Sequence, residues 1–214
     1  MESFGYHTYS KEIPVKNFDL YDIASLTKVA ASTLSIMRMT GEMKLDIDKQ
    51  LQEYLPYLWN TGKGDIIIRE MMAHQSKLTP WIPFYKYTLK DARPDTSFYR
   101  NTISEDFPVR VAAHLYIRKN YNYIIFDSIL SSPLLKTSSY KYSDLGFIFI
   151  PEIMENLVNR PFEDYVDMIF YKPLGVSTTG FLPRKRFPLD RIPPTDVDSV
   201  FRFQLVHGDV HDQG

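Results

Sequence analysis

Ser25 and Lys28 stand three residues apart, and Tyr142, Ser143 and Asp144 follow far downstream. A serine hydroxyl becomes an effective nucleophile when a neighbouring base takes its proton, and a lysine amine or a tyrosinate can be that base. A lysine starts near pKa ~10.4 and needs a decrease of roughly 3 units to act as a base near neutral pH. These residue types therefore predict an acyl-transfer site that needs no histidine.

The sequence around Ser25 and Lys28 predicts a helix that holds the two side chains together. Residues at positions i and i+3 of a helix lie on the same face, about one turn apart. Asp22 is suited to the N-cap and Gly41 to the C-terminal stop of this helix. Ser25 would lie in the first turn, where the helix dipole favours an anionic oxygen by roughly 0.3–1 kcal/mol. The apolar face is expected to comprise Leu26, Val29, Ala30, Thr33, Leu34 and Met37.

The Ser-x-x-Lys pattern is weak by itself, because a chain of this length contains it about once by chance. It occurs again at Ser138 and Lys141, in a Ser/Tyr-rich segment that follows Pro133 and opens no amphipathic helix. We interpret this second match as accidental. For Ser25, the pattern alone leaves two alternatives open: a nucleophile, or a helix-start serine beside a solvated lysine.

Several segments with recognisable motifs follow one another along the chain: Tyr21-Asp22-Ile23-Ala24-Ser25-Leu26-Thr27-Lys28-Val29, Leu45-Asp46-Ile47-Asp48, Tyr54-Leu55-Pro56, residues 68–76, Tyr140-Lys141-Tyr142-Ser143-Asp144-Leu145-Gly146-Phe147, Pro173-Leu174-Gly175-Val176, residues 179–181 and residues 206–212. In this order they resemble the serine β-lactamase and penicillin-binding-protein superfamily, in its class C and esterase-like branch. The resemblance implies that Ser25 is the nucleophile, Lys28 a proton shuttle and Tyr142 the general base, with Asp144 and Ser143 in substrate-binding or supporting roles.

Asp144 stands where the family more often has asparagine. An ionised carboxylate only accepts hydrogen bonds, whereas an amide also donates them. A carboxylate here would hold Lys28 in its charged form and oppose the use of Lys28 as a base. The alternative for Asp144 is an N-cap of the helix predicted to begin at Leu145, and both roles remain open.

The resemblance implies an α+β, β-lactamase/DD-peptidase-like fold, represented mostly by its helical part with an incomplete core sheet. We expect residues 1–214 to form a partial domain without the first strands and without the strand that carries the family's third motif. Lys136-Thr137-Ser138 does not replace that motif, because it precedes Tyr142. An incomplete sheet would leave apolar helix faces exposed, so we expect self-association or poor solubility.

Composition excludes several other classes of function. Twenty-five basic and 26 acidic residues give a net charge of −1, so the chain has no excess of positive charge for binding nucleic acid. It contains no cysteine that could act as a nucleophile. No apolar run approaches the ~18 residues of a membrane span. His207 and His211 have a spacing that zinc sites use, but Gly208 and Asp209 indicate a turn, so no metal or cofactor is expected.

Two further features have structural interpretations. His74, near the end of a predicted helix, is expected to cap carbonyls or pack. An aromatic-rich tract lies between the two motif regions, and we favour the core of a subdomain over a pocket wall for it. Its members are Trp81, Phe84, Tyr85, Tyr87, Phe98, Tyr99, Tyr116, Tyr121, Tyr123 and Phe126.

The sequence therefore predicts a serine hydrolase that forms an acyl-enzyme on an amide, β-lactam or ester, with a small-molecule or peptidoglycan-like substrate. The alternative is a non-catalytic fragment, or an accessory or sensor module, that retains the fold without a complete oxyanion hole. A periplasmic or cell-envelope location follows from the resemblance alone, since no signal peptide is visible.

Overall fold

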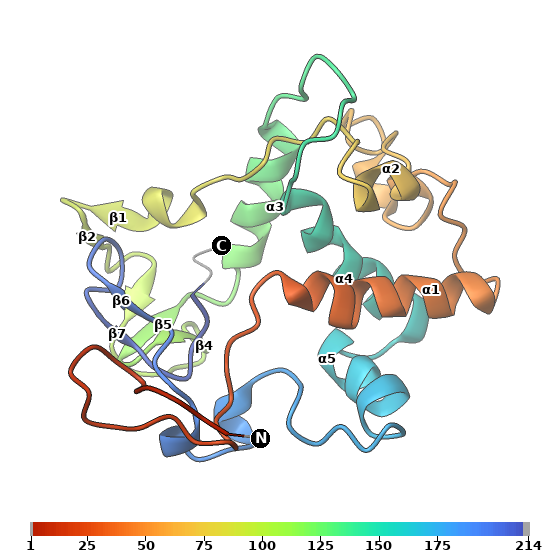
Figure 1. The fold of residues 1–214 in the computed structure, drawn as a ribbon. Coiled ribbons are helices and arrows are strands. Elements are labelled where there is room, and N and C mark those ends of the chain that lie inside the picture. Colours follow the sequence, from red (N-terminus) through yellow and green to blue (C-terminus); the bar gives the residue numbers. More distant parts are fainter. Residues whose placement is uncertain (1, 212–214) are drawn as a thin grey trace. The chain divides into compact units, whose positions relative to one another are not determined.

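The computed structural model describes residues 2–211 and divides them into two compact units. Within the described chain, unit 1 combines residues 2–24, 83–125 and 180–211, and unit 2 combines residues 25–82 and 126–179. Each unit is therefore assembled from segments that lie far apart in the sequence (Figure 1). Asp212, at the end of the predicted loop 206–212, lies outside the described residues.

Helices form most of the regular structure. The α-helices are α1 (Leu34–Gly41), α2 (Ile68–Met72), α3 (Tyr121–Ser131), α4 (Leu145–Val158) and α5 (Phe162–Val166). Two π-helical stretches, Lys28–Thr33 and Asp167–Tyr171, adjoin α1 and α5. Short 3₁₀ turns occupy Leu51–Glu53, Pro56–Leu58, Phe84–Thr88, Pro183–Lys185 and Leu189–Arg191.

The strands are short, antiparallel and confined to unit 1. They pair as β1 with β2, as a three-stranded sheet in the order β3-β5-β4, and as β6 with β7. The strands are β1 (Leu89–Lys90), β2 (Arg93–Pro94), β3 (Tyr99–Arg100), β4 (Val109–Ala112), β5 (Leu115–Ile117), β6 (Asp196–Asp198) and β7 (Gln204–Val206). This mixture of helices and small sheets agrees with the predicted α+β class.

Helix α4 lies at the centre of unit 2 and contacts α2, α5 and the π-helical stretch before α1. Its core side chains Phe149, Ile150 and Ile153 are fully buried. The helix ends at Asn159, whose left-handed backbone (φ 51°) is typical of a helix C-terminus, and α5 starts directly after Pro161. Residues 159–161 therefore separate the two helices.

The helix that follows Ser25 is continuous from residue 26 to 41, but its buried face differs from the prediction. Leu26, Val29 and Met37 were expected to point inward, and each is more than 60% exposed. A π-helical turn contains about one residue more than an α-helical turn, so the positions that face the core differ from those of a regular α-helix. Ser35 tolerates burial because its hydroxyl donates to the carbonyl of Ala31 (2.9 Å). The side chains buried instead are Ala31, Ser32, Ser35, Ile36 and Met39.

The start of α4 also differs from one of the predicted alternatives. Asp144 has a helical backbone conformation, and its side chain makes no capping hydrogen bond. The hydroxyl of Ser143 accepts from the N–H of Leu145 (3.3 Å) and donates to the carbonyl of Thr79 (2.7 Å). The cap is therefore provided by Ser143, and the carboxylate of Asp144 is available for another contact.

Aromatic side chains form the core of unit 1. The ring of Phe201 lies 5.3 Å from that of Tyr85 and 5.8 Å from that of Tyr99. The hydroxyl of Tyr121 donates to the carbonyl of Phe84 (2.8 Å), which satisfies a buried polar group. Several members of the predicted aromatic tract are thus core residues, whereas Trp81, Tyr87 and Tyr123 are exposed.

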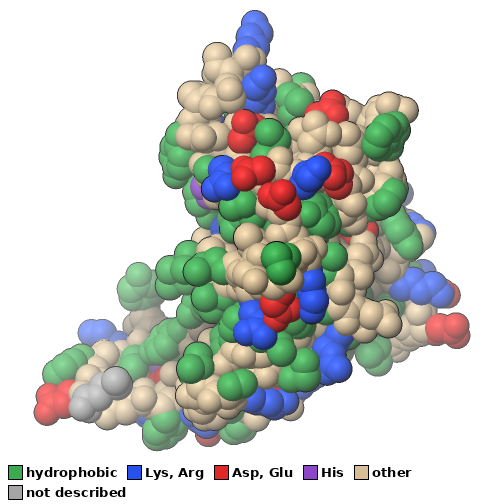
Figure 2. Space-filling model, turned by 90° about the vertical axis from the view of Figure 1, so that its right-hand side faces the viewer, with side chains coloured by type: hydrophobic (Ala, Val, Ile, Leu, Met, Phe, Trp, Pro, Cys, Tyr) green, Lys and Arg blue, Asp and Glu red, His purple; other side chains and the backbone are tan. Residues whose placement is uncertain are grey.

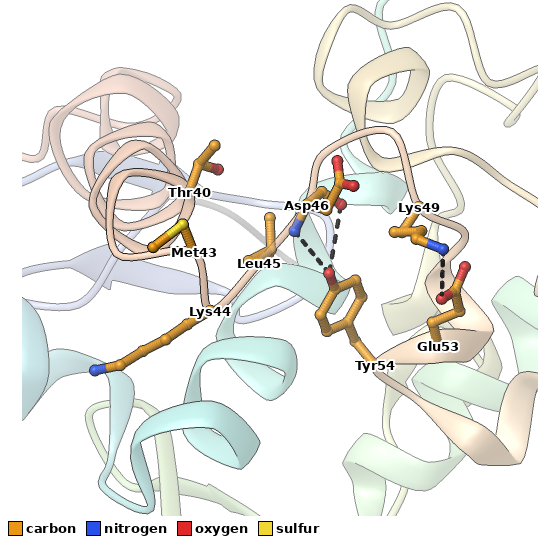
Figure 3. A pocket seen from close by; sticks show the side chains of 8 residues that line it. All are labelled: Thr40, Met43, Lys44, Leu45, Asp46, Lys49, Glu53 and Tyr54. Atoms are coloured by element: carbon orange, nitrogen blue, oxygen red, sulfur yellow. Dashed lines mark hydrogen bonds and ion pairs between the residues drawn. The ribbon is translucent and has the colours of Figure 1, made fainter.

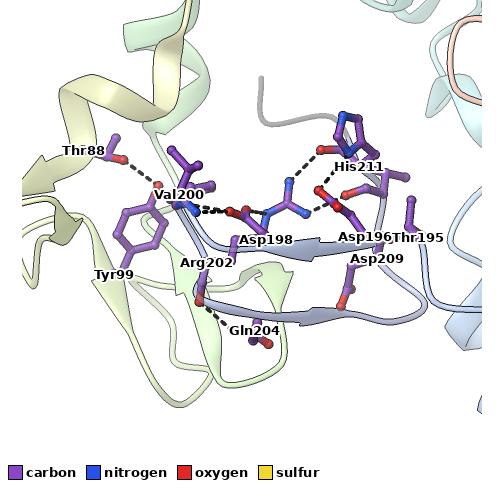
Figure 4. Close-up of polar contacts among 12 residues, drawn as sticks. Thr88, Tyr99, Thr195, Asp196, Asp198, Val200, Arg202, Gln204, Asp209 and His211 are labelled. Atoms are coloured by element: carbon purple, nitrogen blue, oxygen red, sulfur yellow. Dashed lines mark hydrogen bonds and ion pairs between the residues drawn. The ribbon is translucent and has the colours of Figure 1, made fainter. Parts of the chain in front are cut away.

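A buried ion pair stabilises the β6–β7 hairpin (Figure 4). Asp198 and Arg202 have side chains that are each 2% exposed, with Nε of Arg202 3.5 Å from Oδ2 of Asp198. The Arg202 guanidinium also donates to the carbonyls of Val210 and His211, at 2.8 and 3.0 Å. The turn and the segment that follows β7 are therefore fixed by charge-assisted hydrogen bonds.

Hydrophobic side chains also reach the surface (Figure 2). On the helix that follows Ser25, the exposed fraction is 64% for Leu26 and 63% for Val29. These exposures agree with the expectation of apolar helix faces open to solvent. Self-association through them stays a prediction, which sedimentation would test. No helix of the described residues has both the length and the apolar character needed to cross a membrane.

Candidate active site

Ser25 and Lys28 are in contact at the start of the helix in unit 2. Nζ of Lys28 donates to Oγ of Ser25 at 3.0 Å, and the N–H of Lys28 donates to the carbonyl of Ser25, also at 3.0 Å. The predicted proximity of the two side chains is therefore observed, but Ser25 lies in the turn before the helix, which begins at residue 26, and not in its first turn as predicted. The hydroxyl of Ser25 lies at an exposed position, where a substrate has access.

The Lys28 side chain links Ser25 to the segment before α4. Nζ of Lys28 lies 2.5 Å from Oδ1 of Asp144 and 5.4 Å from the centroid of the Tyr142 ring. Tyr142 is 40% exposed, and the side chain of Lys28 is 17% exposed. One ammonium group therefore contacts the side chains of a serine, a tyrosine and an aspartate.

The electrostatic environment of Lys28 favours its charged form. Burial alone lowers the pKa of Lys28, but the contacts with Asp144 and Tyr142 outweigh burial and raise the pKa above its ordinary value. The rings of Tyr142 and Phe147 add cation–π contacts at 5.4 and 5.6 Å from Nζ. Lys28 is thus an ammonium group at neutral pH.

Ser143 is the other supporting residue that was expected from the sequence. It is 4% exposed, and its hydroxyl is engaged by Thr79 and Leu145 as described above. The N–H of Asp144 donates to the carbonyl of Pro80 (3.0 Å). Ser143 therefore anchors the segment that carries Tyr142 and Asp144, and its hydroxyl does not face substrate.

His74 is a member of the site whose contribution the sequence reasoning did not identify. Its imidazole ring lies 4.4 Å from the Tyr142 ring and 5.5 Å from the Phe147 ring. The expectation that His74 would pack is confirmed, but the packing partner is the tyrosine of the site. The available signal was its position two residues before Ser76, in the segment that resembles a family motif.

The backbone immediately before Ser25 has an unusual conformation. Ala24 has φ 44°, in the left-handed region that non-glycine residues seldom occupy. A carboxylate oxygen of Asp22 accepts from the N–H of Ala24 at 2.8 Å and so stabilises this turn. Asp22 therefore closes a turn before the helix, which begins at residue 26, and the prediction that Asp22 is the N-cap is wrong.

The segment 132–143 contains the sequence patterns that were interpreted as accidental. Ser138 and Lys141 lie in irregular structure there, as do Lys136 and Thr137. No helix brings Ser138 and Lys141 onto a common face within this described segment. The structural setting of Ser25 and Lys28 is therefore different from that of the second Ser-x-x-Lys match.

A pocket in unit 2 lies at the other end of the helix from Ser25 (Figure 3). Lys49 in its wall is paired with Glu53 (3.4 Å), and the Tyr54 hydroxyl accepts from the N–H of Asp46 (2.7 Å). The polar groups of the wall thus bond to one another. The lining residues are Thr40, Met43, Lys44, Leu45, Asp46, Lys49, Glu53 and Tyr54.

A family model described as Beta-lactamase matches residues 1–190. The chain belongs to the Beta-lactamase family. This family member has 26% identity over 217 residues to an N-acetylmuramyl-L-alanine amidase of Bacillus subtilis (strain 168), covering 93% of this chain and 44% of the relative. The chain thus spans about half the length of the curated relatives it matches.

Solved structures agree on the fold of this Beta-lactamase family member. A D-amino acid amidase from Ochrobactrum anthropi SV3 superposes with a TM-score of 0.62 at 18% identity, over 90% of this chain and 48% of that one. A penicillin binding protein from Bacillus halodurans gives a TM-score of 0.62 at 16% identity, over 91% of this chain and 53% of that one. The predicted β-lactamase/DD-peptidase-like fold is therefore confirmed.

Proposed function

We propose that Ser25 is the nucleophile of a hydrolase that acts through an acyl-enzyme. The observation that carries the proposal is the position of Lys28, whose Nζ lies 3.0 Å from Ser25 Oγ, 2.5 Å from Asp144 Oδ1 and 5.4 Å from the centroid of the Tyr142 ring. Because Asp144 keeps Lys28 charged, Tyr142 is assigned the role of base. A neighbouring ammonium group stabilises the phenolate that this role requires.

In the proposed reaction, Oγ of Ser25 attacks a substrate carbonyl carbon and its proton passes to Tyr142. The tetrahedral oxyanion then collapses, and Tyr142 returns the proton to the departing amine or alcohol. Water attacks the acyl-serine and loses a proton to Tyr142. As the bond between the carbonyl carbon and Oγ of Ser25 breaks, Tyr142 gives this proton to Oγ, and the carboxylic acid is released. Lys28 stays an ammonium group throughout and stabilises the negative charge on Tyr142.

We assign an amide of peptidoglycan-like chemistry as the substrate class. The assignment is supported by relatives that are named as an N-acetylmuramyl-L-alanine amidase and a D-amino acid amidase. A cell-envelope location goes with this substrate, as the resemblance to penicillin-binding proteins also implied. β-Lactams and esters are the competing acyl donors that the sequence left open.

The proposal is tested by incubating the protein with a D-alanyl amide, a muramyl-L-alanine amide, a penicillin and a simple ester. Release of product and the mass of any covalent intermediate are measured for the native protein and for Ser25→Ala. Amide hydrolysis that disappears in the variant is the expected result. Turnover that survives Ser25→Ala would overturn Ser25 as the nucleophile. Absence of both product and adduct with all four compounds would support the non-catalytic alternative.

A further inference from the structure

His74 holds the backbone on both sides of Tyr142. The carbonyl of His74 accepts from the N–H of Lys141 (2.8 Å), and Nδ1 of His74 accepts from the N–H of Ser143 (3.2 Å). The imidazole ring itself lies against the Tyr142 ring, with 4.4 Å between centroids and 34° between planes. One residue thus fixes the position of the tyrosine through three separate contacts.

The contact with Ser143 determines the protonation state of the imidazole. A backbone N–H can only donate, so Nδ1 must carry a lone pair and the ring proton must be on Nε2. Protonation of His74 would convert Nδ1 into a donor facing another donor. The hydrogen bond that holds the residue after Tyr142 would then be lost.

We propose that neutral His74 is a positioning residue for Tyr142 and that its protonation displaces Tyr142 from Lys28 and Ser25. This inference rests on the proposed function, because it assigns His74 a role in the same reaction. His74 does not contact the reacting atoms. It acts by fixing the two peptide groups and the ring face that orient the phenol oxygen.

The surroundings of His74 favour the neutral form. Burial has the largest effect on the pKa of His74 and lowers it, and the positive charge of Lys28 lowers it further; together they outweigh the contact with Ser143 and the charge of Asp144. The other titratable side chains against the ring are Tyr142 and Tyr140, whose ring lies 6.0 Å away. The left-handed backbone of His74 (φ 56°) explains how its carbonyl and its ring both face the segment 140–143.

Two substitutions separate the contributions of the ring and of Nδ1. His74→Asn keeps a side-chain acceptor and tolerates the left-handed backbone, since asparagine is enriched there. His74→Phe keeps a ring against Tyr142 but removes the acceptor. His114→Asn is the matched control, because His114 also has a left-handed backbone (φ 52°) and is exposed in unit 1.

The rate at which a fluorophosphonate labels Ser25 is measured against pH for each protein. For the native protein and for His114→Asn, we expect the rate to fall below pH 6.5, as His74 becomes protonated. In His74→Asn this fall in rate should be smaller than in the native protein, and the rate at pH 7 should stay within about threefold of the native rate. In His74→Phe, loss of a hydrogen bond should reduce the rate at pH 7 by about tenfold. An unchanged acid limb in His74→Asn, or a native rate in His74→Phe, would overturn the proposal.

A second measurement is independent of catalysis. Amide hydrogen exchange of Ser143 should be slow in the native protein and accelerate at least tenfold in His74→Phe. Equal exchange in the two proteins would overturn the positioning role, whether or not Ser25 is labelled. If Ser25 of the native protein is not labelled while Ser143 exchange changes as expected, the proposed function fails and the structural contact stands.

Discussion

The ammonium group of Lys28 and the carboxylate of Asp144 form an ion pair with an N–O distance of 2.5 Å. The carboxylate offsets the effect of burial on Lys28, so the pKa of Lys28 lies above its ordinary value. A site in which this lysine served as the neutral base would require a pKa far lower. The pair thus assigns proton transfer to Tyr142 in the mechanism proposed here.

Asp144→Asn should move the alkaline limb of Ser25 labelling to lower pH. Without the carboxylate, burial dominates and the pKa of Lys28 falls, so the ammonium form is lost earlier as pH rises. The measurement is the labelling rate between pH 7 and 11. Asp167→Asn is the matched control, since it removes an exposed ion pair with Lys172 in the same unit. A faster rate at pH 7 in Asp144→Asn would instead show that Lys28 acts as the neutral base.

Tyr142→Phe should slow Ser25 labelling by about 100-fold or more, the typical contribution of a general base. The phenylalanine ring can still pack on His74, so circular dichroism should show a native fold. Tyr140→Phe is the neighbouring control, because Tyr140 is 65% exposed and its ring also contacts His74. Equal rates in Tyr142→Phe and the native protein would exclude Tyr142 as the base.

Asp198→Asn should lower the free energy of unfolding of unit 1 by about 3–5 kcal/mol at pH 7, because Arg202 would keep a buried charge without its partner. Burial raises the pKa of Asp198, but backbone N–H groups of Phe201 and Val200 and the charge of Arg202 outweigh burial and lower it. The stabilisation is therefore present above the ordinary pKa of 3.8 and is lost as pH falls through the lower value in the folded state.

Urea unfolding at neutral and acidic pH tests this prediction for Asp198. The difference in the free energy of unfolding between Asp198→Asn and the native protein should decrease as the pH falls below the pKa of Asp198 in the folded protein. Asp48→Asn removes the exposed ion pair with Arg69 and should change stability little. Similar losses of stability in Asp198→Asn and Asp48→Asn would contradict the expectation that the buried ion pair contributes more to stability than the exposed one.

Gly146→Ala should destabilise unit 2 by about 1–3 kcal/mol through overpacking. A Cβ at Gly146 would clash with Cγ of Met71, a buried residue of α2 that packs against α4. Thermal unfolding measures the loss, and Met71→Ala in the same protein should recover part of it. Gly41→Ala is the control at a site with open space for a Cβ. Equal stability of Gly146→Ala and Gly41→Ala would show that α4 moves to make room for the added methyl group without loss of stability.

The contact between Ser25 and Lys28 could be predicted from the sequence because it is local. A helix places residues at i and i+3 together whatever the rest of the chain does. The association of Lys28 with Tyr142 and Asp144 depends on tertiary structure, and it was expected only through the resemblance to a known family. Periodicity alone could not have identified the tyrosine.

The buried face of the helix after Ser25 could not be predicted from apolar spacing. The π-helical turns at Lys28–Thr33 change the angle per residue, and Ser35 is buried because its own helix satisfies its hydroxyl. His74 was missed for a related reason. Its importance comes from two backbone N–H groups in a distant loop, which leave no pattern in the sequence around it.

The most direct test of the central claim is peptide mapping of the protein after reaction with a fluorophosphonate. In this reaction Ser25 Oγ bonds to phosphorus and fluoride leaves, so only an activated serine is modified. We predict an adduct on Ser25 that is lost in Ser25→Ala and retained in Ser138→Ala, which alters the other Ser-x-x-Lys match. An unmodified Ser25, or equal modification of Ser25 and Ser138, would contradict the assignment of Ser25 as the nucleophile.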